Sequence, residues 1–199
     1  MFKKVLIANR GEIAVRVIRA CKEWGIGTVA VHSDVDSDSM HVRLADESVC
    51  IGSHQPQNSY LNIPAIISAI DVTGAEAVHP GYGFLSENFK FADMIQKHGI
   101  KFVGPSAQII KKMGDKIEAK KIAKQNGLPI IEGSEGGVES IDKAKSICKN
   151  IGYPILIKAS GGGGGKGMKI VESEEQLGNM FSLARLEAKK YFGNEEVYI

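Results

Sequence analysis

The sequence has few of the residues that mark several classes of protein. It contains one tryptophan and three cysteines, Cys21, Cys50 and Cys148, which lie far apart among apolar neighbours. This spacing favours reduced thiols in the core over a disulfide framework, and no close Cys/His pair suggests a metal site. We therefore expect a cytoplasmic protein.

Long apolar runs and an excess of one charge are also missing. The N-terminal apolar run is short and is interrupted by Asn9 and Arg10, and no segment approaches the roughly 18 apolar residues of a membrane-spanning helix. Lys and Arg number 25 against 23 Asp and Glu, a net charge of +2. Such a weak field indicates neither nucleic acid nor an anionic membrane as a partner.

The first half of the sequence does contain a regular alternation of strand and helix patterns. The first helix is expected over residues 11–24, with Ile13, Val17, Cys21 and Trp24 at helical spacing. Asn62 and Ser86 are candidate N-caps of later helices. Short apolar runs predict buried strands over 5–8, 28–31, 48–51, 77–79 and 101–103. This alternation predicts an α/β fold with a doubly wound, mostly parallel, Rossmann-like sheet.

The second half has a different order of elements. Asp115 is a candidate N-cap for a connecting helix that ends at Gly127. A strand from Leu128, a helix over 141–150, strands over 154–159 and 168–171 and a helix over 174–190 follow. We therefore expect an N-terminal domain over 1–113, a helical connector over 114–127 and an α+β lid subdomain over 128–199.

The last residues, Glu196-Val-Tyr-Ile199, form an apolar run typical of the start of a strand. No later segment is present to turn back or to pair with it, and a domain seldom ends in this way. The expectation is a truncated lid subdomain in a fragment of a longer protein.

A glycine-rich segment, KASGGGGGKGM over residues 158–168, lies between two predicted strands. Backbone N–H groups without nearby Cβ atoms can hold a phosphate there. Ordering six glycines costs on the order of 6–12 kcal/mol, so the loop should stay open until a polyanion binds. A flexible linker is the alternative, but the position between two strands favours a phosphate lid.

Neither common nucleotide motif fits the sequence. A Walker P-loop ending at Lys166 would need Gly at position 160 and Ser or Thr at 167, where the chain has Ser160 and Gly167. A dinucleotide fingerprint after the first strand fails because Gly11 stands alone. Lys116 at a helix start and Lys158 at a strand end are locally unfavourable, and both would gain from a bound phosphate.

The segment HPGYGFLSE, residues 79–87, follows a predicted strand and leads into a helix. Ligands bind at the carboxyl ends of strands in doubly wound sheets. His79, Tyr82 and Glu87 are the polar side chains available there, although an ordinary turn with a core histidine explains the segment equally well.

Taken together, these segments closely resemble the biotin carboxylase family of the ATP-grasp superfamily, which includes the corresponding parts of acetyl-CoA, pyruvate and acyl-CoA carboxylases. The resemblance spans the whole chain and is carried by IANRGEIAVRVIRA (7–20), SYLNIPAII (59–67), HPGYGFLSEN (79–88), MGDK (113–116) and the glycine segment.

The resemblance implies roles for individual residues. Tyr82, Gly83 and Glu87 match positions near the biotin and bicarbonate site. Lys166 stands where the family often has Arg, which keeps the charge but loses a bidentate phosphate contact. The residues implied to bind ATP are Lys116, Lys158, Gly162, Gly163, Gly164, Gly165, Lys166, Gly167 and Met168.

The resemblance also implies a reaction: ATP phosphorylates bicarbonate to carboxyphosphate, which delivers CO₂ to N1′ of biotin on a carrier protein or domain. Magnesium is an implied cofactor, but its ligands and the catalytic residues are expected after residue 199, so the fragment should be inactive alone. The implied partners are a biotin carboxyl carrier, a carboxyltransferase component and a second copy of the chain.

Two alternatives stay open. The chain could be a non-catalytic dimerisation or assembly module, with Arg16, Arg19 and Glu23 on one helical face as the contact, although a solvated face explains the same pattern. It could also belong to another ATP-grasp ligase, which should lack the combination of HPGYGFLSEN and ANRGEIA.

Overall fold

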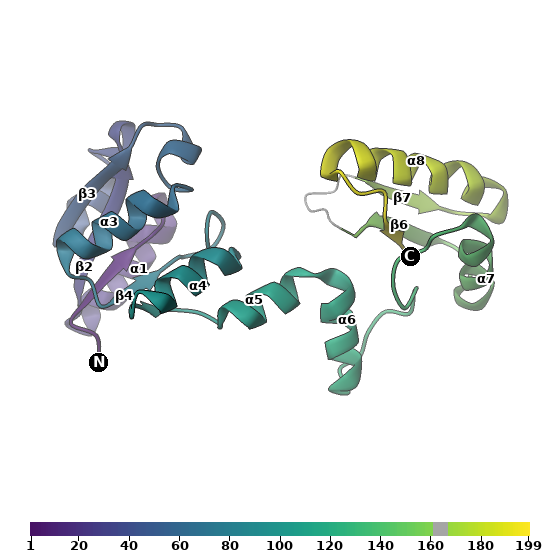
Figure 1. Cartoon of the computed structure of the whole chain (residues 1–199), viewed down its shortest axis with the longest axis horizontal. Coiled ribbons are helices and arrows are strands. Elements are labelled where there is room, and N and C mark those ends of the chain that lie inside the picture. The colour runs from purple at the N-terminus through teal and green to yellow at the C-terminus, as the bar shows by residue number, and fades with distance from the viewer. Residues whose placement is uncertain (161–166) are drawn as a thin grey trace. The chain divides into compact units, whose positions relative to one another are not determined.

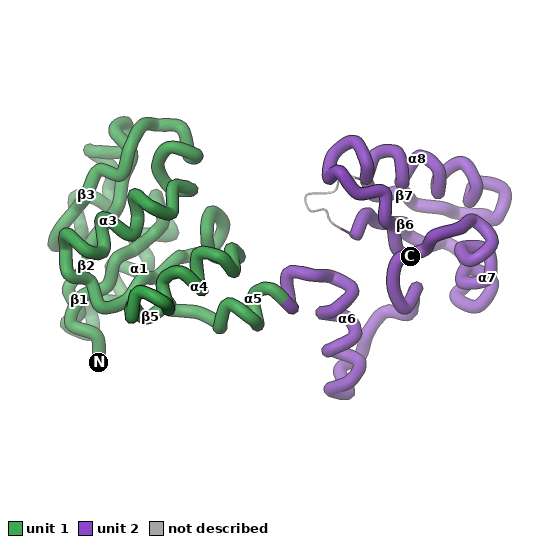
Figure 2. Tube along the Cα trace, viewed as in Figure 1, with its two compact units in different colours: residues 1–111 green, residues 112–199 purple. Residues whose placement is uncertain are grey.

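The computed structural model describes residues 1–160 and 167–199, and it divides into two compact units, Met1–Lys111 and Lys112–Ile199 (Figure 2). Each unit has its own sheet and its own core.

Unit 1 alternates strands with helices (Figure 1). Two short 3₁₀ turns, Asp34–Asp36 and Pro56–Asn58, lie within its connections. In chain order its elements are β1 (Lys4–Ile7), α1 (Gly11–Glu23), β2 (Gly27–Ser33), α2 (Met40–Leu44), β3 (Glu47–Gly52), α3 (Ile63–Thr73), β4 (Ala77–His79), α4 (Phe89–Lys97), β5 (Lys101–Phe102) and α5 (Ala107–Gly114), which runs into unit 2.

The sheet of unit 1 has the order β3-β2-β1-β4-β5, and all of its pairings are parallel. Successive residues of β1 point to opposite faces, so Leu6 packs in the core that includes Ile66 and Phe91, while Ile7 packs with Ala14 and Ile18 of α1. Helices therefore cover both faces, and the predicted doubly wound parallel sheet is confirmed.

Unit 2 contains a three-stranded antiparallel sheet of order β7-β6-β8, with α7 and α8 on one face (Figure 1). The sheet and helices form a mixed α/β arrangement, as the sequence predicted. Its elements are α6 (Lys116–Gln125), α7 (Ile141–Ile151), β6 (Ile155–Ala159), β7 (Met168–Val171), α8 (Glu174–Phe192) and β8 (Val197–Tyr198).

The caps explain where several of these helices begin. The Asn62 side chain accepts a hydrogen bond from the Ala65 N–H, and Asp115 accepts from the N–H groups of Ile117 and Glu118, as predicted. The predicted cap at Ser86 is wrong. Asn88 caps α4 by accepting from Phe91, because the chain makes a further turn in which the Ser86 N–H donates to the Gly83 carbonyl.

Three other predictions from the sequence are corrected by the structure. Residues 128–140 form no strand, since this segment makes only isolated bonds to the last strand, through Ser134 and Val138. The predicted start of a strand at the C-terminal run is confirmed, because β8 pairs antiparallel with the earlier strand β6. Trp24 lies beyond the end of α1 and is 68% exposed, and Cys50 is exposed because β3 is an edge strand.

Candidate functional site

The two faces of the unit 2 sheet are chemically different. Ile155, Ile157 and Ala159 alternate along β6 and are buried against the helices. Lys158 points to the other face, where it pairs with Met168 of β7 on one side and Tyr198 of β8 on the other. Residues opposite each other in an antiparallel sheet share a face, so these three side chains form a row.

Apolar side chains surround the lysine in this row. Leu156 and Ile170 form the next pair on the same face, and Met168 and Ile170 are 42% and 65% exposed. Burial raises the pKa of the Tyr198 hydroxyl above its ordinary value. An apolar strip with one ammonium group suits a flat ring joined to an anionic group.

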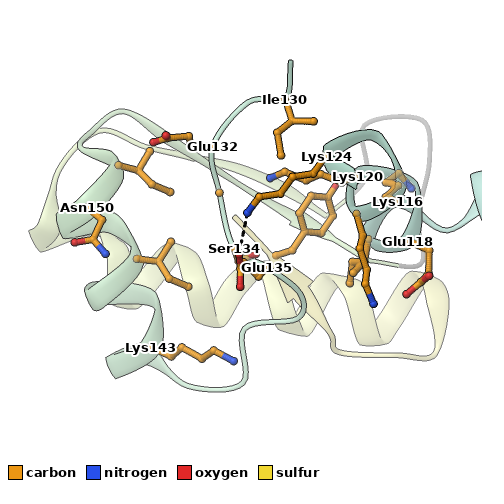
Figure 3. Close-up of a pocket in the computed structure, with 16 residues that line it drawn as sticks. Lys116, Glu118, Lys120, Lys124, Ile130, Glu132, Ser134, Glu135, Lys143 and Asn150 are labelled. Atoms are coloured by element: carbon orange, nitrogen blue, oxygen red, sulfur yellow. Dashed lines mark hydrogen bonds and ion pairs between the residues drawn. The ribbon is translucent and has the colours of Figure 1, made fainter. Parts of the chain in front are cut away.

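A cavity of about 860 Å³ lies in the same unit, and lysines of α6 line it (Figure 3). Tyr198 is also part of the lining. Lys116 is the first residue of α6, directly after the Asp115 cap. Lys120, Lys121 and Lys124 follow on the same helix, and Lys124 forms an ion pair with Glu135 at 3.1 Å. Tyr198 belongs both to this lining and to the row that contains Lys158.

The glycine segment is described only at its ends. The predicted ATP-binding residues Gly162, Gly163, Gly164, Gly165 and Lys166, with Gly161, lie outside the described residues. Gly167 is buried at φ +70°, and a Cβ built on it would lie 3.1 Å from that of Ala159, while its carbonyl accepts a hydrogen bond from the Ala159 N–H. The return of the chain into β7 therefore favours glycine at this position.

The predicted biotin-facing residues lie in unit 1, at the carboxyl edge of its sheet. The strand order reverses between β1 and β4, and such a switch point leaves a crevice in which ligands bind. The segment after β4 contains Tyr82, 60% exposed, whose hydroxyl donates to Glu12 at 2.8 Å. Gly83 has φ +73°, and Glu87 is exposed. Burial lowers the pKa of His79, whose Nδ1 accepts from the Gly81 N–H.

Sequence reasoning missed a polar cluster at the same edge of the sheet. Arg10 binds Asp36 through two hydrogen bonds of 2.7 and 2.6 Å, and the Tyr60 hydroxyl donates to Asp36 at 2.6 Å. The Arg10 hydrogen bond holds the pKa of Asp36 well below its usual range, and the same bond raises the pKa of Arg10. The available signal was a pair of opposite charges, Arg10 and Asp36, each three residues after the end of a buried parallel strand.

The residues predicted as a dimer contact, Arg16, Arg19 and Glu23, are all exposed on α1. Their spacing of three and four residues places them on one side of the helix, away from buried Ala14 and Ile18.

Family models match almost the whole chain. The biotin carboxylase N-terminal domain matches residues 1–110, and the ATP-binding domain of the carbamoyl-phosphate synthase L chain matches residues 115–199. The chain belongs to the biotin carboxylase family. The biotin carboxylase of Haemophilus influenzae is 57% identical over 100% of this chain, which covers 45% of that relative.

Solved structures of biotin carboxylases have the same fold. A Campylobacter jejuni biotin carboxylase in complex with β,γ-ATP matches with a TM-score of 0.91 and 46% identity, and the chain covers 44% of it. A biotin carboxylase domain dimer from Hydrogenobacter thermophilus 2-oxoglutarate carboxylase, in complex with MgADP, ADP and bicarbonate, matches with a TM-score of 0.87 and 49% identity. Both matches extend over 100% of this chain. The chain covers 44% of the Hydrogenobacter structure.

In residues 1–160 and 167–199, no group of three or more His, Cys, Asp or Glu side chains is arranged to bind a metal ion. None of the helices in the described parts of the chain has the length and apolar character needed to span a bilayer.

Proposed function

We propose that this chain supplies the nucleotide-facing and biotin-facing residues of an ATP-dependent biotin carboxylase. The row Met168–Lys158–Tyr198 on the open face of the unit 2 sheet is the observation that carries the proposal. Met168 would lie against the adenine, and the Lys158 ammonium would neutralise phosphate charge as a compact cation. Lys116 and residues 162–167 would contact the remaining phosphates.

The proposed reaction has two parts. A bicarbonate oxygen attacks the γ-phosphorus of ATP, ADP leaves, and carboxyphosphate forms; its breakdown gives phosphate and CO₂. The N1′ nitrogen of biotin then loses its proton to a base and bonds to the CO₂ carbon. The residues of this chain contribute by positioning and by charge neutralisation, which dominate phosphoryl-transfer catalysis. In the described part of the chain, no group of three or more His, Cys, Asp or Glu side chains is arranged to hold a magnesium ion.

Substitution of Lys158 tests the nucleotide assignment. Because the chain covers 45% of its Haemophilus relative, turnover is measured in a protein of full family length that carries these residues. Lys158→Ala removes a charge-assisted contact, so the KM for ATP should rise by about ten- to a hundredfold in bicarbonate- and biotin-dependent ATP hydrolysis. Lys169→Ala is the matched control, because Lys169 lies in the same hairpin but points to the other face and pairs with Glu187. Equal kinetics for Lys158→Ala and the wild type would refute the assignment.

We further propose that the protein dimerises through α1 and acts with a biotin carboxyl carrier and a carboxyltransferase component, as in the acetyl-CoA carboxylases of fatty acid synthesis. A cytoplasmic location belongs to the same proposal. The Hydrogenobacter domain is described as a dimer, and the exposed row Arg16, Arg19 and Glu23 offers both charge signs for a symmetric contact. Sedimentation of Arg19→Glu should give the monomer mass, while Arg43→Glu, at an exposed position on α2, should keep the dimer mass.

A further inference from the structure

Asn9 lies at the switch point between β1 and β4, and both N–H groups of its side-chain amide donate hydrogen bonds. The residue is 0% exposed. Its Nδ2 donates to the carbonyl of Pro80 at 2.8 Å and to the carbonyl of Tyr82 at 3.0 Å, and its Oδ1 accepts from the Arg10 N–H at 2.9 Å. A buried amide with both donors on one loop fixes the path of that loop.

The backbone of the loop lies directly on this amide. Gly81, between the two bonded carbonyls, has φ +64°, and a Cβ built on it would lie 2.7 Å from Asn9 Nδ2 and 2.7 Å from Ile13 Cγ2. Any larger residue would push the loop off Asn9. The glycine of HPGYGF is therefore needed for close approach as well as for its backbone conformation.

A second contact holds the far end of the same loop. Phe84 has φ +41°, an uncommon conformation for a residue with a side chain, and its ring stacks on Tyr60 with centroids 5.1 Å apart. The Tyr60 hydroxyl is in turn bound to Asp36, the partner of Arg10. The loop is thus held at Pro80, Tyr82 and Phe84, while the Tyr82 side chain remains exposed.

We propose that Asn9 is a positioning residue for biotin: it holds the backbone of the loop so that the Tyr82 side chain meets the ureido ring. This inference rests on the proposed function, which places Tyr82 near biotin. It gives a physical role to the ANRGE segment, which contains one glycine where a dinucleotide fingerprint needs three.

The first test compares two Michaelis constants in a protein of full family length, with free biotin as the probe. Asn9→Ala removes both bonds to the loop, so the KM for biotin should rise about tenfold. The KM for ATP should stay within about twofold, because Lys116 and Lys158 belong to unit 2. The control Asn62→Ala removes the cap bond to Ala65 in the same unit. It should lower the Tm and leave both KM values unchanged. An unchanged biotin KM in Asn9→Ala, with a raised one in Tyr82→Ala, would overturn the inference.

A double-mutant cycle separates positioning from general destabilisation. If Asn9 acts through the loop, Asn9→Ala combined with Tyr82→Ala should raise the biotin KM no further than Tyr82→Ala alone. Additive effects would contradict the positioning role. If Tyr82→Ala itself leaves the biotin KM unchanged, the assignment of Tyr82 under the proposed function fails, and this inference fails with it.

A third measurement uses the 199-residue chain itself. Amide hydrogen exchange in residues 81–87 should accelerate at least about tenfold in Asn9→Ala, with exchange in β2 unchanged. Should the alanine variant not fold, Asn9→Ser keeps a hydroxyl donor and part of the volume and is expected to show a smaller acceleration. Wild-type exchange in the loop of a folded variant would refute the proposed contact.

Discussion

The two sheets of this chain differ in how their faces are covered. In unit 1, Leu6 and Ile7 point to opposite faces and are both 0% exposed, because helices cover each side. In unit 2, one face is buried against α7 and α8, while Met168 and Ile170 on the other face stay exposed around Lys158. Exposed apolar groups around a cation contribute little to folding and are suited to a ligand. Residues on the covered faces therefore stabilise the fold, whereas residues on the open face of the unit 2 sheet are available to bind a ligand.

The largest effect on stability is expected in the unit 2 hairpin, where one isoleucine lies on the buried face of the sheet and another lies on the open face. Ile157→Ala leaves a cavity in the buried core, so the free energy of unfolding should fall by about 2–5 kcal/mol. Ile170→Ala removes an exposed side chain and should cost less than about 0.5 kcal/mol. Urea denaturation followed by circular dichroism measures both values. Equal losses would show that the two faces are covered alike.

The second effect concerns the charged cluster of unit 1. Asp36→Asn removes the charge-assisted hydrogen bonds that the buried carboxylate accepts from the half-exposed Arg10 and from Tyr60, so the free energy of unfolding should fall by about 2 kcal/mol. Asp38→Asn, two residues away and exposed, should change it by less than about 0.5 kcal/mol. The same urea titration compares the two variants, and a small loss at Asp36 would mean that the cluster is solvated.

Acid should weaken unit 1 through the same carboxylate. The pKa of Asp36 is lowered in the folded state, so its contribution is complete above the unfolded value of about 3.9 and is lost as the pH falls toward the folded value. Between pH 7 and pH 3 the wild type should lose about 1 kcal/mol more than Asp36→Asn does. Parallel pH curves for the two proteins would exclude Asp36 as the source of acid sensitivity.

The smallest effect on stability is expected at Lys158. Lys158→Met keeps the side-chain stem and removes an ammonium group that lies among Leu156, Met168 and Tyr198. The free energy of unfolding should change by less than about 0.5 kcal/mol, while ATP binding to the 199-residue chain weakens by at least about tenfold. Denaturation and equilibrium dialysis together test this. A marked loss of stability would assign Lys158 to the fold instead.

Much of the fold followed from local patterns. The strands of unit 1 were predicted because β-branched apolar runs buried on both faces leave a strong signal, and β4 has the predicted bounds. In unit 2, β7 also has the predicted bounds. The caps at Asn62 and Asp115 were predicted because each acts on N–H groups two or three residues away. Such interactions depend on neighbours in the sequence alone.

Errors arose where distant residues decide the outcome. Ser86 and Asn88 are comparable caps, and the turn of residues 83–86 selects the second. Cys50 is exposed because its strand lies at the sheet edge, which the local sequence does not specify. Tyr198 was predicted to lie at the start of a strand, but the local sequence did not show that this strand pairs with Lys158, 40 residues earlier in the chain.

The sequence by itself determined the alternation of strands and helices, the caps, the candidate residues Lys116, Lys158 and Tyr82, and the resemblance that led to the family. Only the tertiary structure placed Met168 and Tyr198 beside Lys158, and only it brought Asn9 onto the loop that contains Tyr82, 73 residues away. The reason is physical. Periodicity and capping are set within a few residues, whereas strand order and register, which bring distant side chains together, are fixed by the packing of the whole unit.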